Sequence, residues 1–140
     1  MSRGRVDLTE SAAVMVRRRL EDWAEAVRSH DLERLIAYHV DDFVYFDVPP
    51  PTQVRGLAGY RDSWPPFFDY IGDNGTFELS ELEVAAGDVA FGHAILRVRG
   101  AFESRTGQVR LTVGLRRIDG EWWISHEQHS APYIAVRSGQ

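Results

Sequence analysis

Residues 41–51 read Asp-Asp-Phe-Val-Tyr-Phe-Asp-Val-Pro-Pro-Pro, an aromatic strand that ends at a carboxylate and runs into prolines. Side chains alternate between the two faces of a strand, so Phe43, Tyr45 and Asp47 share one face. The prolines cannot donate ladder hydrogen bonds, so the strand stops there or becomes a sheet edge. Asp47 has two interpretations. A carboxylate buried on an aromatic face binds protons more readily and could transfer them, whereas one at a strand end can simply accept hydrogen bonds from the turn.

The sequence before and just after this strand has helical patterns. Residues 1–8 are polar and we expect them to be flexible, with a helix starting near Thr9 or Ser11. Apolar residues then recur at helical spacing, at Val16, Leu20, Trp23 and Val27. Asp31 is placed to cap a second, short helix. A third helical segment opens at Gly56 and is expected to end or kink at Pro65-Pro66.

After the turn at residues 72–75 the hydrophobic period changes to two. Four strands are predicted, at residues 76–84, 89–99, 108–118 and 121–130, with turns between them. Helices followed by an antiparallel meander indicate an α+β fold, with the helices packed on one face of a curved sheet. We predict a single domain over residues 9–130 and a tail over residues 131–140.

Composition restricts the function classes. The 140 residues carry a net charge of −5, which argues against a broad nucleic-acid surface. The absence of cysteine excludes disulfides, thiolate catalysis and cysteine-based zinc sites. No apolar run is long enough for a membrane span, and we expect a cytoplasmic protein.

Several features, in this order, resemble the NTF2-like superfamily, in particular its SnoaL-like and ketosteroid-isomerase-like branch. They are Trp23, residues 30–32, Asp41-Asp42, Gly56, Trp64 and the ending from Thr112 to His126. The resemblance implies a cone-shaped fold with a mostly antiparallel, strongly curved sheet, a homodimer formed through the outer face of the sheet, and no cofactor. It also places Asp47 at the position of the isomerase's catalytic base.

The same comparison departs from the isomerase at its oxyanion site. There a tyrosine and a protonated aspartic acid hold the enolate oxygen. Here Trp23 and Trp64 stand at tyrosine positions, and the strand Leu111–Leu115 has no carboxylate. An indole N–H only donates and is a poorer acid than a phenol. The departure therefore argues against steroid isomerisation by that mechanism.

The resemblance makes Trp123, Ser125, Glu127 and His129 the pocket face of the last strand. The register of the Asp119-Gly120 hairpin decides which neighbours share that face. If Ile118 pairs with Glu121, the neighbours are the polar set Arg110, Thr112, Gly114 and Arg116. If Arg117 pairs with Glu121 through a bulged turn, they are Val109, Leu111, Val113 and Leu115, and we prefer this version because it buries the more apolar face.

Candidate roles follow for the polar groups. His129 could donate a proton while Asp47 removes one, or it could be a hydrogen-bonded residue at the pocket rim or dimer interface. Glu127 could orient His129 or pair with an arginine. His126 and His129 point to opposite faces of a strand, which argues against a zinc pair. His93 is read as a pocket-wall or core residue. The aromatic core residues that could also form walls for a ligand are Trp23, Tyr45, Tyr60, Trp64 and Phe67.

Three functions compete at this stage. The first is a cofactor-independent enzyme in which Asp47 acts as base on a small, largely apolar molecule, by isomerisation, cyclisation or dehydration. The second is a non-catalytic binding or dimerisation module whose pocket holds an apolar ligand or is filled by Trp23 and Trp64. The third, epoxide hydrolysis, needs Arg110 between Asp47 and Glu127 and therefore the first hairpin register.

Overall fold

The computed structural model describes residues 2–133, with side chains from Ala12 onward. Its first half contains three helices and two strands, α1 (Ser2–Arg28), α2 (Leu32–Ile36), β1 (His39–Phe46), β2 (Val54–Arg55) and α3 (Leu57–Ile71). A meander of four long strands follows, β3 (Thr76–Ala86), β4 (Val89–Arg99), β5 (Gly107–Ile118) and β6 (Glu121–Ser130). The predicted α+β order is confirmed, and the four predicted strands lie where the period of two placed them.

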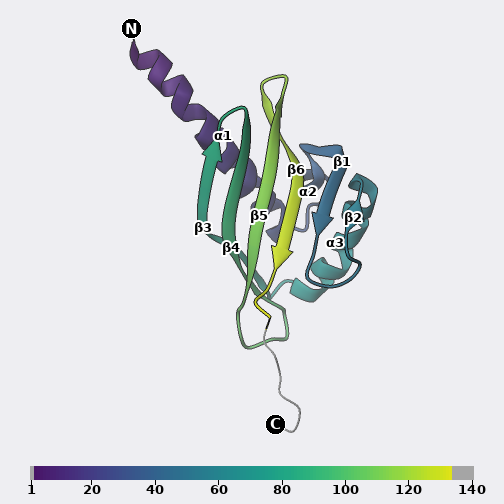
Figure 1. Ribbon diagram of the computed structural model, residues 1–140. Helices are drawn as coiled ribbons and strands as arrows, with labels where there is room; N and C mark the ends of the chain where they lie inside the picture. The colour runs from purple at the N-terminus through teal and green to yellow at the C-terminus, as the bar shows by residue number, and fades with distance from the viewer. Residues whose placement is uncertain (1, 134–140) are drawn as a thin grey trace.

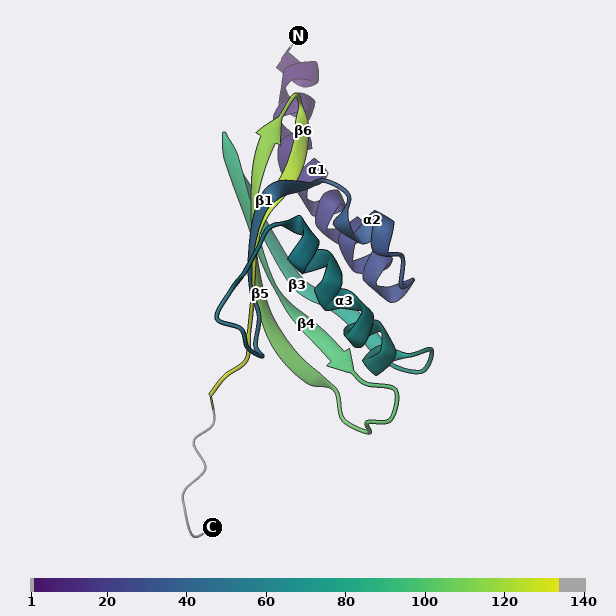
Figure 2. The same cartoon turned by 90° about the vertical axis from the view of Figure 1, so that its right-hand side faces the viewer.

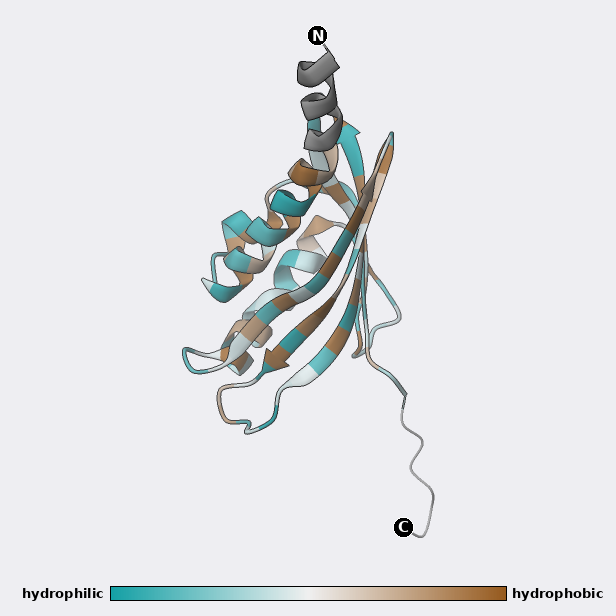
Figure 3. Cartoon of the chain, turned by 90° about the vertical axis from the view of Figure 1, so that its left-hand side faces the viewer, coloured by the Kyte–Doolittle hydropathy of each residue, from teal (hydrophilic) through white to brown (hydrophobic). Residues whose placement is uncertain are grey.

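The strands form one curved, six-stranded sheet in the order β2-β1-β6-β5-β4-β3 (Figure 1). All neighbours are antiparallel except β1 and β6, which run parallel. The three helices cover one face of this sheet and leave the other uncovered (Figure 2). Hydrophobic and hydrophilic residues alternate along the strands, as expected for a sheet with one covered face (Figure 3). No helix among the described residues has the length and apolar character of a membrane span.

The core forms between α1, α3 and the covered face. The predicted stripe of α1 is buried, with Val16, Leu20, Trp23 and Val27 each no more than 3% exposed. Phe43 and Tyr45 of β1 are buried on the same side, as their alternation predicts. Asp31 caps α2 by accepting a hydrogen bond from the backbone N–H of Arg34.

Two helices differ from the prediction. Helix α1 begins at Ser2, ahead of the expected start near Thr9 or Ser11. Helix α3 continues through Pro65 and Pro66 to Ile71. Both prolines are exposed, so the backbone carbonyls they leave without helical partners lie on the solvent side, where water can satisfy them. Of the predicted tail, residues 134–140 lie outside the described residues.

The hairpin between β5 and β6 corrects the preferred register. Ile118 pairs with Glu121 across a two-residue turn, in which Asp119 and Gly120 have φ of 51° and 82°. A bulge follows, because Leu115 pairs with Ile124 while Gly114 pairs with His126. The extra residue, Ser125, shifts the alternation by one.

The bulge decides which side chains of β6 point inward. Before it, Trp122 and Ile124 are buried; after it, Glu127 and His129 are. The neighbours of the last two on β5 are the apolar residues Val113 and Leu111, which belong to the set we preferred. The expectation that Trp123 and Ser125 share the pocket face is therefore wrong. Trp123 packs against the Tyr38 ring, and the Ser125 hydroxyl donates to the Gly114 carbonyl at 3.1 Å.

Candidate active site

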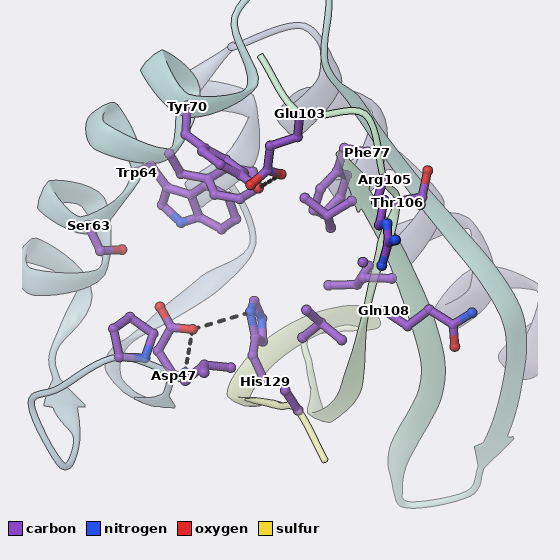
Figure 4. Close-up of a pocket in the computed structure, with 18 of the residues that line it drawn as sticks. Asp47, Ser63, Trp64, Tyr70, Phe77, Glu103, Arg105, Thr106, Gln108 and His129 are labelled. Carbon is purple, nitrogen blue, oxygen red and sulfur yellow. Dashed lines mark hydrogen bonds and ion pairs between the residues drawn. The ribbon is translucent and has the colours of Figure 1, made fainter. Parts of the chain in front are cut away.

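A cavity of about 990 Å³ lies between α3, the β4–β5 loop and the ends of β1 and β6 (Figure 4). Its apolar wall includes Trp64, Phe67, Phe77, Leu96, Val98 and Val109. Its polar groups include Tyr45, Asp47, Ser63, Gln108 and His129. An apolar cavity with a few convergent polar groups, of several hundred Å³, is typical of small-molecule sites. The tryptophans therefore do not fill the space, since Trp64 forms part of the wall and Trp23 lies behind it, with ring centroids 6.0 Å apart.

Glu127 lies under the cavity and is fully buried. Its Oε2 accepts a hydrogen bond from the Tyr60 hydroxyl at 2.8 Å and lies 3.0 Å from His39 Nε2. Its Oε1 lies 3.1 Å from His129 Nε2. Burial alone would raise the pKa of Glu127, but the hydrogen bonds from His129 and His39, together with their charge, lower it to about 2. Glu127 is therefore an ionised carboxylate at neutral pH.

The hydrogen bonds around Glu127 form a directed chain. Trp23 Nε1 donates to the Tyr60 hydroxyl at 2.9 Å, and that hydroxyl donates to Glu127. An indole nitrogen only donates, so the direction of both bonds is fixed. Burial, and next the negative charge of Glu127, raise the pKa of Tyr60 well above its ordinary value, so the phenol keeps its proton.

The partners of the two histidines assign their protons. His39 Nδ1 lies 3.1 Å from the Ala37 carbonyl and Nε2 faces Glu127. Both partners only accept, so each His39 nitrogen can bond its partner only when that nitrogen carries a proton. His129 Nε2 also faces the carboxylate and carries a proton. In the neutral His129 ring, Nδ1 then holds the lone pair.

His129 Nδ1 faces the cavity side. It lies 3.4 Å from the Tyr45 hydroxyl and 3.9 Å from Asp47 Oδ1, and Figure 4 shows the imidazole and the Asp47 carboxylate facing one another across the cavity wall. Burial, and next the Asp47 charge, raise the pKa of Tyr45, so its hydroxyl stays a donor. Asp47 also accepts a hydrogen bond from its neighbour's N–H, Val48, at 2.7 Å. Asp47 thus lines the cavity and accepts a hydrogen bond from its turn, but its side chain is 30% exposed and not buried as the first interpretation required.

Comparison with known proteins places this arrangement in a family. The family model described as a SnoaL-like domain matches residues 16–134. The chain belongs to the SnoaL-like family.

Solved structures agree with that assignment. An NTF2-like protein of unknown function from Pseudomonas putida KT2440 is 38% identical over 89% of each chain, with a TM-score of 0.81. A candidate dehydratase of the NTF2-like family from Streptomyces avermitilis is 19% identical over 91% of this chain and 99% of its own, with a TM-score of 0.74. A candidate scytalone dehydratase from Novosphingobium aromaticivorans is 16% identical over 98% of each, with a TM-score of 0.71. No curated protein matches the sequence.

In this SnoaL-like chain the predicted site residues fall into three groups. Cavity-lining residues are Tyr45, Asp47, Trp64, Phe67 and His129. Supporting residues behind the wall are Trp23, Tyr60 and Glu127. Three predicted pocket residues lie elsewhere: Trp123 against Tyr38, Ser125 at the bulge, and His93 on the uncovered face of β4 beside Phe91. His93 points outward because its neighbours Gly92 and Ala94 occupy the inward positions of β4.

Sequence reasoning missed His39, which it treated as a helix-end residue without a function. The structure begins β1 at His39 and buries its side chain to 2% exposure. Strand alternation does not identify it, because β1 is irregular between His39 and Val44, where Val40 is buried and Asp41 is exposed. From the sequence, one possible partner of Glu127 was an arginine. In the structure its partners are His39, His129 and Tyr60.

The arrangement that epoxide hydrolysis would need does not form. Arg110 lies exposed on the uncovered face, where its Nε donates to the Ser130 hydroxyl at 3.1 Å, so it does not stand between Asp47 and Glu127 as epoxide hydrolysis would need. Across residues 2–133, no cluster of three or more His, Asp or Glu side chains is arranged to hold a metal ion.

Proposed function

We propose that this SnoaL-like chain is an enzyme that moves protons within a small, largely apolar molecule without a cofactor. The reaction class is isomerisation, aldol-type cyclisation or dehydration. One observation carries the proposal: the His129 imidazole stands between buried Glu127, 3.1 Å away, and Asp47, 3.9 Å away, at the wall of the apolar cavity. A histidine held by a carboxylate on one nitrogen, with its other nitrogen on the cavity side, is a usual arrangement of a general base.

The proton movements balance without any further group. Asp47 or His129 Nδ1 takes a proton from an activated carbon of the substrate. The protonated base then returns that proton to another carbon, which is isomerisation, or to a leaving hydroxyl, which is dehydration. The Tyr45 hydroxyl can donate a hydrogen bond to the oxygen on which negative charge develops. An imidazolium formed at His129 would lie between two carboxylates, which stabilise its charge.

Hydrogen–deuterium exchange at carbon tests this proposal without a known product. The protein is incubated in D₂O with a panel of cyclic ketones, enones and β-hydroxyketones, and deuterium at the carbon next to the carbonyl is measured by mass spectrometry. Asp47→Asn and His129→Gln should each slow enzyme-dependent exchange by about 10²- to 10⁴-fold, the usual contribution of a general acid or base. Equal exchange in wild type and both variants would contradict the proposal.

Matched controls come from the same chain. Asp42→Asn changes an exposed aspartate that pairs with Arg116, and His93→Gln changes an exposed histidine of β4. Both should exchange deuterium at the wild-type rate. If the cavity binds apolar molecules but accelerates no exchange above buffer, the chain is a binding module, which was the second hypothesis from the sequence.

A further inference from the structure

The mouth of the cavity carries a cation that the proposed chemistry does not use. Arg105 lies in the loop at residues 100–106 between β4 and β5 and lines the cavity. Arg105 is exposed, and in Figure 4 its guanidinium lies near Thr106 at the edge of the cavity, away from Asp47 and His129. Over residues 2–133, the arginines that pair with a carboxylate are Arg19, Arg28, Arg61 and Arg116. Arg105 is therefore a cation without an acidic partner in the described part of the chain.

The nearby acid of the same loop, Glu103, is already engaged. Its carboxylate accepts hydrogen bonds from the Tyr70 hydroxyl and, at 3.1 Å, from the backbone N–H of Gly100. The hydrogen bond from Tyr70, and next that from Gly100, lower the pKa of Glu103, so it is ionised and held against α3. Figure 4 shows this pair on the α3 side of the cavity, apart from the Arg105 guanidinium.

The charges of the cavity are thus separated. Asp47 carries negative charge at one end, and the apolar side chains of Phe77, Leu96 and Val109 line the wall. Glu127 lies behind that end, with its two oxygens facing His39 and His129. At the loop, Arg105 carries positive charge, and the loop carboxylate, Glu103, is bound to the Tyr70 hydroxyl and the Gly100 N–H on the α3 side. A ligand anion would be repelled by Asp47 and attracted by Arg105, so an apolar molecule with one anionic group has a single favourable orientation.

We propose that Arg105 is a specificity-determining residue and that the substrate is an apolar molecule carrying one anionic oxygen group, such as a carboxylate. The anionic group lies at the β4–β5 loop while the reacting carbon lies at His129 and Asp47. The inference rests on the proposed function in that it takes the cavity as the substrate site. It adds the charge of the substrate and the end at which it is held.

A pair of fluorescent probes that differ mainly by one anionic group tests the inference. 8-Anilinonaphthalene-1-sulfonate is anionic, and N-phenyl-1-naphthylamine is the neutral analogue. Each is titrated against wild type, Arg105→Gln, Arg105→Lys and the control Arg97→Gln, in which an exposed arginine of β4 is changed away from the cavity. Arg105→Gln should weaken the affinity for the sulfonate probe by about three- to tenfold, as expected for a charge contact that is partly exposed to water. The affinity for the neutral probe should change by less than twofold.

The other variants separate charge from structure. Arg105→Lys should keep most of the affinity for the sulfonate because it keeps the charge, and Arg97→Gln should bind both probes like wild type. Equal affinity of wild type and Arg105→Gln for the sulfonate would overturn the inference, and so would an equal loss of both probes in Arg105→Gln. Failure of wild type to bind either probe would instead contradict the cavity as an apolar ligand site, and with it the proposed function.

Discussion

His39 Nε2 and Glu127 Oε2 lie 3.0 Å apart in the interior of the protein, and their side chains are 0% and 1% exposed. The pair joins the start of β1 to the end of β6, two strands that run parallel in the sheet. A buried charge whose partner is removed loses its compensation without regaining water. Glu127 therefore contributes both to the stability of the fold and to the position of the His129 ring.

Glu127→Gln should lower the free energy of unfolding by about 3 kcal/mol, since it removes the buried carboxylate that His39, Tyr60 and His129 all face. The measurement is urea denaturation followed by tryptophan fluorescence. Glu121→Gln is the matched control on the same strand, because Glu121 is half exposed and pairs with Arg19 at the surface. That variant should lose less than about 1 kcal/mol. Similar losses in the two variants would contradict a special role for the buried pair.

Acid should destabilise the protein through the same carboxylate. The pKa of Glu127 falls from its ordinary 4.5 to about 2 in the folded protein. A lowered folded pKa means that the stabilisation is fully present above pH about 4.5 and is lost as the pH falls toward 2. The shift corresponds to about 3 kcal/mol.

Other carboxylates titrate over the same pH range, so the informative quantity is a difference. The stability gap between wild type and Glu127→Gln should narrow between pH 5 and pH 2.5, measured by denaturation at each pH. If the difference in free energy of unfolding stays constant over that range, ionisation of Glu127 does not contribute to stability.

Tyr60→Phe should destabilise the protein by about 1 to 3 kcal/mol and leave its fold intact. The hydroxyl accepts from Trp23 and donates to Glu127, so its loss leaves a buried donor and a buried acceptor each short of one hydrogen bond. Tyr70→Phe removes the hydroxyl of an exposed tyrosine and serves as the control. Differential scanning calorimetry compares the two, and equal melting temperatures would refute the expectation.

The uncovered face of the sheet is the surface on which we expect a homodimer. Val89 and Phe91 of β4 are 66% and 50% exposed there. Light scattering should give twice the chain mass of 15.9 kDa at working concentration. Phe91→Arg should shift the particle toward the monomer, while Phe102→Arg, which changes a fully exposed residue at the cavity mouth, should not. A monomeric wild-type mass would exclude the dimer.

The helices and strands could be predicted because their signals are local. The α1 stripe from Val16 to Val27 and the alternation after residue 75 each record burial on one face, and Asp119-Gly120 suits the positive φ values of the hairpin turn. The continuation of α3 past Pro65 could not be predicted, because it depends on which side of the helix faces solvent.

The site was predictable only in part. Asp47, Glu127 and His129 could be named, since they are polar groups on apolar strands. Their mutual geometry depends on the pairing of β1 with β6, which joins segments more than 80 positions apart. The bulge carries no distinctive residue, and without it the alternation from Trp122 would have turned Glu127 and His129 outward. His39 was missed for the same reason, because its partner lies across the sheet.

The bulge also determines which single-residue deletions in β6 would leave the side chains of this site directed inward. Within the described β5–β6 ladder, Ser125 has no partner of its own, as Ile124 and His126 pair with consecutive residues of β5. Loss of Ser125 would leave those pairings in place, with Glu127 and His129 still directed inward. Loss of Gln128 would turn His129 to the opposite face while Glu127 stayed buried. In related chains, a deletion at position 125 is therefore compatible with the candidate site, whereas a deletion at position 128 would remove His129 from it.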